Sequence, residues 1–190
     1  MIRNQAVAAL LLSLPVVAMT ACSSAQKPSS PASSAPAVQS SSTKPAGTLS
    51  AHLKTAEGTP VADATFDFSN GLASVRIQTV ATGILAPGSH AVHIHEIGKC
   101  EPNSVAPEGG PPGNFLSAGG HYQAPGHTGQ LASGDLPPLE VRPDGSGSLQ
   151  TTTDAFTKDQ LLAGKGTALM IHGVGDMAME RVACGVIGTS

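Results

Sequence analysis

Eight short segments in which polar and apolar residues alternate recur along this 190-residue chain, separated by turns rich in Gly and Pro. Side chains alternate between the two faces of a strand, so each segment predicts a strand with one face in a core. At hairpin spacing, they favour an all-β fold, either an antiparallel barrel or a sandwich. We expect strands at 48–54, 61–68, 72–81, 89–95, 139–142, 148–153, 167–172 and 181–187, and a short helical turn at 157–162.

The N-terminal part of the chain has a different pattern. An apolar run over 6–18 follows Arg3, and small residues lead to Cys22, which resembles a bacterial lipoprotein signal. The run is shorter than the ~20 residues that a membrane span needs. We therefore expect a signal peptide at 1–21, lipid on the Cys22 thiol and a membrane-anchored protein in the cell envelope. Simple secretion is the alternative, because Met19 stands where Leu is usual.

Composition separates a tether from a folded domain. Residues 22–46 consist largely of Ser, Ala, Pro, Gln and Lys, which cannot bury enough apolar area to fold, so we expect a flexible tether there. The folded domain is then 47–190. The formal net charge of −3, without clustered Lys and Arg, argues against a nucleic-acid partner. The sequence leaves the oligomeric state open.

Three of the seven histidines lie in the segment 89–95. On a strand, His93 and His95 project to one face, while Val92 and Ile94 project to the other. One face can then join a core and the other can bind a metal. Two imidazoles at i and i+2 can share a transition-metal ion without completing its coordination shell, so further ligands are needed.

Two more histidines complete a ligand set. His121 lies in a loop over 101–138 that is rich in Gly and Pro, and His172 ends an apolar strand. A loop of this length in a small domain is usually functional or disordered, and its His and Asp content favours function. Four imidazoles suit copper, which tolerates flattened tetrahedral or square geometry, but they also suit zinc.

Two cysteines remain once Cys22 is assigned to lipid. Cys100 and Cys184 in an exported domain most simply form one disulfide. It would join the base of the long loop to the last strand, and chain entropy assigns such a link roughly 4 kcal/mol.

Taken together, these motifs resemble the copper/zinc superoxide dismutase family. The matching segments are His90-Ala91-Val92-His93-Ile94-His95 with Gly98 and Cys100, Ala118-Gly119-Gly120-His121, Gly134-Asp135-Leu136-Pro137, and Arg181-Val182-Ala183-Cys184-Gly185-Val186-Ile187-Gly188. The resemblance covers about residues 47–188. It implies an eight-stranded antiparallel Greek-key barrel with a long metal-binding loop, superoxide as substrate and copper as cofactor.

The resemblance also implies roles for single residues. Arg181 matches an arginine that lies over the copper and attracts the anion, and His121 matches a histidine that bridges copper and zinc, so these two are the candidate catalytic residues. His90 matches a structural histidine, and Asp176 an aspartate that links the ligands of the two metals. The implied copper ligands are His93, His95, His121 and His172, and the implied disulfide is Cys100–Cys184.

The chain departs from the family pattern at the zinc site. His121, His127 and Asp135 match three zinc ligands, but Ala132 stands where the fourth, a histidine, is expected. Structural zinc is almost always held by four ligands, so we expect weak or absent zinc binding. Only residues 173–180 separate His172 from Arg181, where the family usually carries a longer charged loop.

Two function classes follow. The first is a copper-only superoxide dismutase of the cell envelope. The alternative is an exported copper-binding or copper-buffering protein of the same fold with little dismutase activity, since fold does not fix function. An adhesive β domain would require all four histidines to be incidental.

Overall fold

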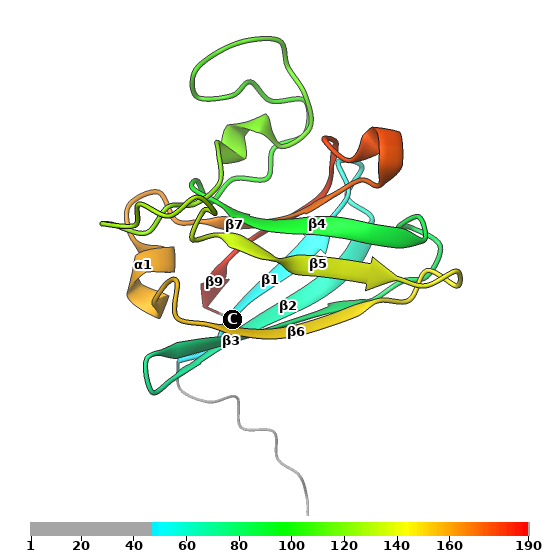
Figure 1. Cartoon of the computed structure of the whole chain (residues 1–190). Coiled ribbons are helices and arrows are strands. Elements are labelled where there is room, and N and C mark those ends of the chain that lie inside the picture. The colour runs from blue at the N-terminus through cyan, green and yellow to red at the C-terminus, as the bar shows by residue number, and fades with distance from the viewer. Residues whose placement is uncertain (1–46, 190) are drawn as a thin grey trace, which may run out of the picture. The chain divides into compact units, whose positions relative to one another are not determined.

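The computed structural model describes residues 47–189 (Figure 1). The predicted signal peptide at 1–21, the tether at 22–46 and Cys22 lie outside the described residues. The strands are β1 (Leu49–Lys54), β2 (Pro60–Ser69), β3 (Leu72–Thr79), β4 (Gly88–His95), β5 (Asp135–Val141), β6 (Ser148–Thr153), β7 (Ala168–His172), β8 (Arg181–Val186) and β9 (Gly188–Thr189).

The strands form an antiparallel barrel that is nearly closed. Their hydrogen-bonded order is β5-β4-β7-β8-β1-β2-β3-β6, and the short β9 pairs with β1. A bridge between Val141 and Gly147 brings the two ends of this order together, where the β5–β6 turn begins and ends. Neighbours that are not consecutive in sequence, such as β4 with β7 and β3 with β6, create the crossovers of a Greek key. The all-β prediction is confirmed.

The helices are short. α1 (Lys158–Leu162) begins after Thr157, whose hydroxyl accepts a hydrogen bond from the Gln160 backbone, while the Gln160 side chain accepts one from the Thr157 backbone. The 3-10 turns are η1 (Leu116–Ala118) and η2 (Gly175–Met177). No helix in the described part of the chain is long and apolar enough to cross a membrane.

One strand begins earlier than its sequence pattern predicted. β5 begins at Asp135 rather than at residue 139, and it includes Pro137 and Pro138. Proline cannot donate a ladder hydrogen bond, so it is tolerated only at sheet edges and bulges. β5 ends the strand order, and its pairing with β4 shifts register between His90 and Val92, so both conditions are met.

The sheet of β4, β7 and β8 separates two different sets of side chains. Val92, Ile94, Leu169 and Ile171 are fully buried in the barrel core. The alternate positions face outward, toward the loop after β4. A second apolar cluster lies on that outer side and consists of Phe115, Ala118, Ala168, Met170 and Cys184. The loop is therefore packed onto the barrel wall beside the outward-facing histidines.

Candidate metal centre

Four histidines meet on the outer face of the barrel. One ring nitrogen from each lies within 4.8 Å of the corresponding nitrogens of the others. The ring centroids of His93 and His121 are 3.9 Å apart, and those of His93 and His172 are 4.9 Å apart. The cluster is formed by His93, His95, His121 and His172, the residues that the sequence singled out. It is the one group of this kind found within residues 47–189.

Strand register brings three of these histidines together. His93 pairs with Met170 and His95 with Ala168 across the β4–β7 ladder, so His172 follows on the same outward face. The pairing of β7 with β8 is irregular between Ile171 and His172. This places the last residue of β7 at the edge of the cluster.

His121 reaches the cluster from the long loop. It forms an isolated antiparallel bridge with His95. The next residue, Tyr122, donates its backbone N–H to the Ile94 carbonyl at 2.8 Å and is largely buried. The end of the loop is therefore fixed to β4, which sets the position of His121.

Three ring nitrogens in the cluster have no hydrogen-bond partner. These buried atoms of the described residues are His93 Nδ1, His95 Nε2 and His172 Nε2. A buried polar atom without a partner costs free energy, so native proteins rarely retain one without a reason. Convergence of unpartnered imidazole nitrogens is what a transition-metal ion requires, and the residues therefore fit a copper or zinc ion.

Hydrogen bonds made by Nδ1 atoms orient rings of the cluster. His95 Nδ1 donates to the Gly119 carbonyl at 3.0 Å, and His121 Nδ1 donates to Asp135 Oδ1 at 2.8 Å. The backbone of Met179 lies near the His172 ring. A proton fixed on one nitrogen leaves the lone pair of the other free for a metal. The bonds thus set both the tautomer and the direction of the His95 and His121 rings.

Burial keeps three of the imidazoles neutral. It lowers the pKa of His95 to about 3, although the hydrogen bond to Gly119 acts in the opposite direction. Burial also lowers the pKa of His172 to about 4 and that of His93, with neighbouring positive groups adding to the effect. Neutral imidazole is the form that binds a metal, so these rings are ready to bind at neutral pH.

Arg181 lies beside the cluster and is held by two backbone carbonyls. Its guanidinium donates to the Phe115 carbonyl and to the Gly119 carbonyl, each at 2.8 Å. The side chain is half buried, which lowers its pKa, while Glu108 raises it. Arginine remains charged in proteins, so the site carries a fixed positive charge beside the histidines.

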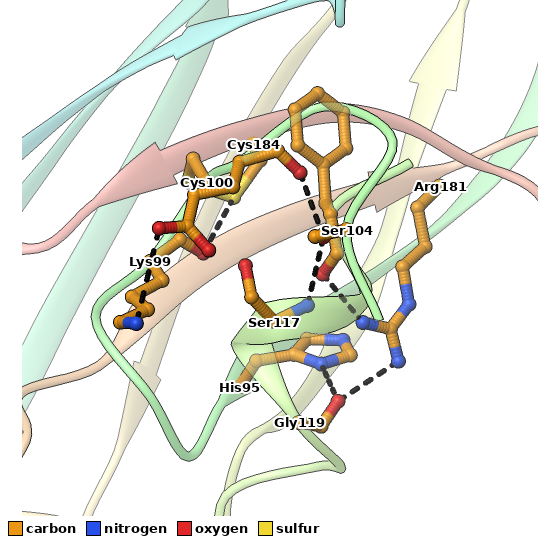
Figure 2. The surroundings of a disulfide bond; sticks show 10 residues. His95, Lys99, Cys100, Ser104, Ser117, Gly119, Arg181 and Cys184 are labelled. Atoms are coloured by element: carbon orange, nitrogen blue, oxygen red, sulfur yellow. Dashed lines mark hydrogen bonds and ion pairs between the residues drawn. A yellow bond between two sulfur atoms is a disulfide. The ribbon is translucent and has the colours of Figure 1, made fainter. Parts of the chain in front are cut away.

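A disulfide anchors the loop that supplies those carbonyls. Cys100 and Cys184 are joined, with a Cα–Cα distance of 5.6 Å, which confirms the predicted bond. Figure 2 shows the bond above the segment that carries Ser117 and Gly119, with the Arg181 guanidinium and the His95 ring converging on Gly119. The two ends of the disulfide thus connect the start of the loop to β8, the strand that begins with Arg181.

His90 lies on the opposite face of β4 and does not join the cluster. It is buried, with its ring nitrogens 2.6 Å from the His172 carbonyl oxygen and 2.8 Å from the Ala86 carbonyl oxygen. The ring therefore ties the β7 backbone at a metal-site histidine to the segment that precedes β4.

The residues predicted to bind zinc are only partly brought together. His121 and Asp135 are in contact, but the ring of His127 donates to the Leu131 carbonyl at 2.8 Å. Asp135 Oδ2 accepts the backbone N–H of Ala132 at 2.9 Å. Within the described part of the chain, His127 does not join a group of three or more metal-ligating side chains.

Asp176 lies in η2 and is exposed. It makes no hydrogen bond or ion pair with another described residue. The carboxylate that contacts His121 instead comes from Asp135, which the sequence placed among zinc ligands.

Gly119 is the residue whose importance the sequence analysis missed. Its backbone has φ of 74°, and a Cβ there would collide with the Glu96 side chain, so glycine is required. The Gly119-Gly120 pair directly before His121 was the available signal.

Comparison with known proteins supports the same assignment. The family model for copper/zinc superoxide dismutase matches residues 61–187. A superoxide dismutase [Cu-Zn] of Mycolicibacterium paratuberculosis is 51% identical over 212 aligned positions, covering 91% of this chain and 93% of that protein. One of Mycobacterium tuberculosis is 44% identical over 227 positions, covering 99% and 95%.

A solved structure agrees with the fold. The Cu/Zn superoxide dismutase from Brucella abortus superposes with a TM-score of 0.58 at 26% identity, covering 74% of this chain and 99% of that one. The barrel, the four-histidine cluster and the relatives lead to one assignment: this chain belongs to the copper/zinc superoxide dismutase family.

Proposed function

We propose that this protein is a copper-dependent superoxide dismutase of the cell envelope that works without zinc. Two superoxide anions and two protons would give oxygen and hydrogen peroxide. The observation that carries the proposal is the convergence of unpartnered nitrogens from His93, His95 and His172 beside His121. When bound there, copper would supply a centre that accepts an electron from one superoxide and returns it to another.

Arg181 would attract and position the anion. Its charge is fixed beside the cluster by the carbonyls of Phe115 and Gly119, so its position costs no rearrangement when substrate arrives. A planar guanidinium also keeps N–H groups available for a small anion while it donates to these carbonyls.

His121 would handle a proton. Its Nδ1 is engaged with Asp135, which leaves Nε2 as the atom that can take up and release a proton. The side chain is 41% exposed, so this nitrogen can exchange protons with solvent. Formation of peroxide consumes protons, which makes this exchange useful to turnover. His121→Ala should therefore reduce turnover, and an unimpaired variant would exclude this role.

The copper-only part of the proposal rests on the positions that the resemblance matches to zinc ligands. Ala132 offers no ligand, and the His127 ring is engaged by Leu131 rather than by His121 and Asp135. The test is metal content after loading with both metals, read beside dismutase activity. We expect equimolar copper, zinc far below it, and activity. Stoichiometric zinc would contradict the copper-only proposal, and Ala132→His should raise the zinc content.

Envelope location is a separate part of the proposal and rests on the N-terminal signal with Cys22. Fractionation of cells that express the full chain, with Cys22→Ser as the comparison, tests it. Membrane association that is lost in the variant would support lipid anchoring. Equal amounts of both proteins in the soluble exported fraction would favour simple secretion.

Copper buffering remains as a second candidate. The connection 173–180 is short, and its residues Gly175–Glu180 are exposed, so it offers little to shape a substrate channel. A copper-loaded, oxidised protein with complete copper occupancy and negligible dismutase activity would favour buffering.

A further inference from the structure

Two methionines in the connection 173–180 have unusual exposure. The side chains of Met177 and Met179 are 56% and 87% exposed. Met170, the remaining methionine of the described residues, is completely buried in the outer apolar cluster, as is typical of this residue type. Neither exposed thioether has a role in the proposed dismutase reaction.

Backbone contacts tie both methionines to His172. The Met179 backbone lies near enough to the His172 ring to affect its protonation. Gly173 directly follows His172, and the main chain of Met177 packs so closely on it that a Cβ there would collide. The Gly173 N–H donates to the Glu180 carbonyl at 2.9 Å, which closes the turn. These contacts place the main chain of Met177 and Met179 beside His172, and the exposed side chains extend from there.

The chemistry of a thioether determines which ion it would bind. Thioether sulfur is a soft ligand that selects Cu(I), whereas Cu(II) and zinc prefer imidazole. Met177 and Met179 are separated by one residue, so their Cα atoms are at most about 7 Å apart. Each side chain has three rotatable bonds, so both sulfur atoms can reach one ion. His172 Nε2, which is unpartnered, is the nearest imidazole ligand along the chain.

We propose that Met177 and Met179 form a Cu(I) acquisition site at the edge of the four-histidine centre. The thioethers bind cuprous ion at the surface and pass it to His172 and then to the other histidines. Transfer is a ligand exchange in which a nitrogen replaces each sulfur, and the oxidation state of the ion does not change. The inference rests on the proposed function, because copper is the metal assigned to the centre.

The first test locates the ion. Metal-free, oxidised full-length protein with ¹³C-labelled methionine methyl groups is titrated with Ag(I), a soft monovalent ion that does not change oxidation state under these conditions. We expect the methyl signals of Met177 and Met179, assigned with single Met→Leu variants, to shift. The buried Met170 is the internal control and should not respond at low silver. Unchanged Met177 and Met179 signals at one equivalent would overturn the proposal.

The second test measures delivery. Cu(I) is transferred anaerobically from a chromophoric cuprous chelator to the metal-free protein. Met177→Leu/Met179→Leu keeps apolar side chains but removes both sulfur atoms, and transfer should slow by on the order of tenfold. Leu72→Ile, at the exposed first residue of β3, is the control and should transfer at the parent rate. Equal rates in parent and double variant would contradict an acquisition role.

A third readout separates this inference from the proposed function. The Cu(II) electron paramagnetic resonance spectrum of the loaded double variant should match that of the parent, which shows that the histidine centre is intact. A copper-loaded parent without dismutase activity would reject the proposed function. The transfer rates would still decide whether Met177 and Met179 acquire Cu(I). Slow transfer together with an altered spectrum would mean damage to the centre and would reject the acquisition role; the single variants Met177→Leu and Met179→Leu repeat the test with a smaller change.

Discussion

His95 and Arg181 donate hydrogen bonds to the same atom, the carbonyl oxygen of Gly119, at 3.0 and 2.8 Å. One peptide group therefore orients a proposed copper ligand and the proposed anion-binding group together. A shift of this peptide would disturb metal binding and substrate attraction at once.

Substitution at Gly119 tests that link. Gly119→Ala places a Cβ against Glu96 in a backbone conformation that disfavours side chains. We expect a loss of about 1–3 kcal/mol in the free energy of unfolding, together with weaker copper binding. The matched control is Gly120→Ala, where a Cβ has only Glu96 Oε1 within 4 Å, at 3.9 Å. Urea unfolding and copper titration of both variants give the comparison, and equal behaviour would refute the strain at Gly119.

Charge at Arg181 should control the rate. Arg181→Glu reverses the charge beside the cluster, and we expect superoxide removal to slow by on the order of ten- to a hundredfold. Arg181→Lys keeps the charge but loses the two guanidinium N–H groups that donate to the carbonyls of Phe115 and Gly119. Its rate should therefore lie between those of the parent and of Arg181→Glu. Pulse radiolysis at several salt concentrations measures this. Because the connection 173–180 is short, the parent should show shallow salt dependence, and Arg142→Glu in the β5–β6 turn should behave like the parent.

Two matched variants test which aspartate, Asp135 or Asp176, orients the His121 ring. Asp135→Asn removes the charged acceptor for His121 Nδ1, and we expect copper affinity to fall by about ten- to a hundredfold. Asp176→Asn makes the same chemical change at an exposed position without a hydrogen-bond partner among the described residues, and it should bind copper as the parent does. Competition with a Cu(II) chelator measures both affinities. A larger effect at Asp176 would transfer the orienting role to that residue.

Acid should destabilise the metal-free protein through buried histidines. The pKa values of His95 and His172 lie at about 3 and about 4 in the folded protein, below the ordinary 6.5. At a pH between the folded and the ordinary pKa of these histidines, the unfolded chain binds more protons than the folded protein. The free energy of unfolding therefore falls as the pH falls from about 6.5 toward 3. We expect a loss of several kcal/mol, measured by urea unfolding at several pH values.

Two variants identify the source of that pH dependence. His95→Gln/His172→Gln removes the buried titrating rings and should flatten the curve. His52→Gln changes an exposed histidine on β1 and should preserve it. A curve that keeps its slope in the double variant would assign the acid sensitivity to other groups.

Much of the barrel follows from local sequence pattern. Alternation located β6 at 148–153 as observed, and the other predicted strands match to within a few residues. The exceptions depend on tertiary context. β5 runs through Pro137 and Pro138 because it lies at an edge of the strand order. β9 is only Gly188–Thr189, too short for any alternation to be visible.

The grouping of the four histidines was predictable from the sequence, but the contacts that orient them were not. His93 and His95 share a face by strand periodicity, His121 and His172 were added from the loop and from the end of an apolar strand, and the family resemblance then assigned all four to copper. The contact of Asp135 with His121 depends on the pairing of β4 with β5, in which Asp135 lies opposite His93. No local pattern specifies that register, and none shows that His127 turns toward Leu131.

The alternation along β4 and β7 has a consequence for how such a protein can change over evolutionary time. The barrel core takes Val92, Ile94, Leu169 and Ile171, while the histidines and the loop occupy the reverse side. Substitutions at exposed positions on the reverse side leave the packing of the barrel core in place. Position 132 and the connection 173–180 can then vary in residue type or length without altering that core. New metal handling can therefore arise on this wall of the barrel at little risk to folding.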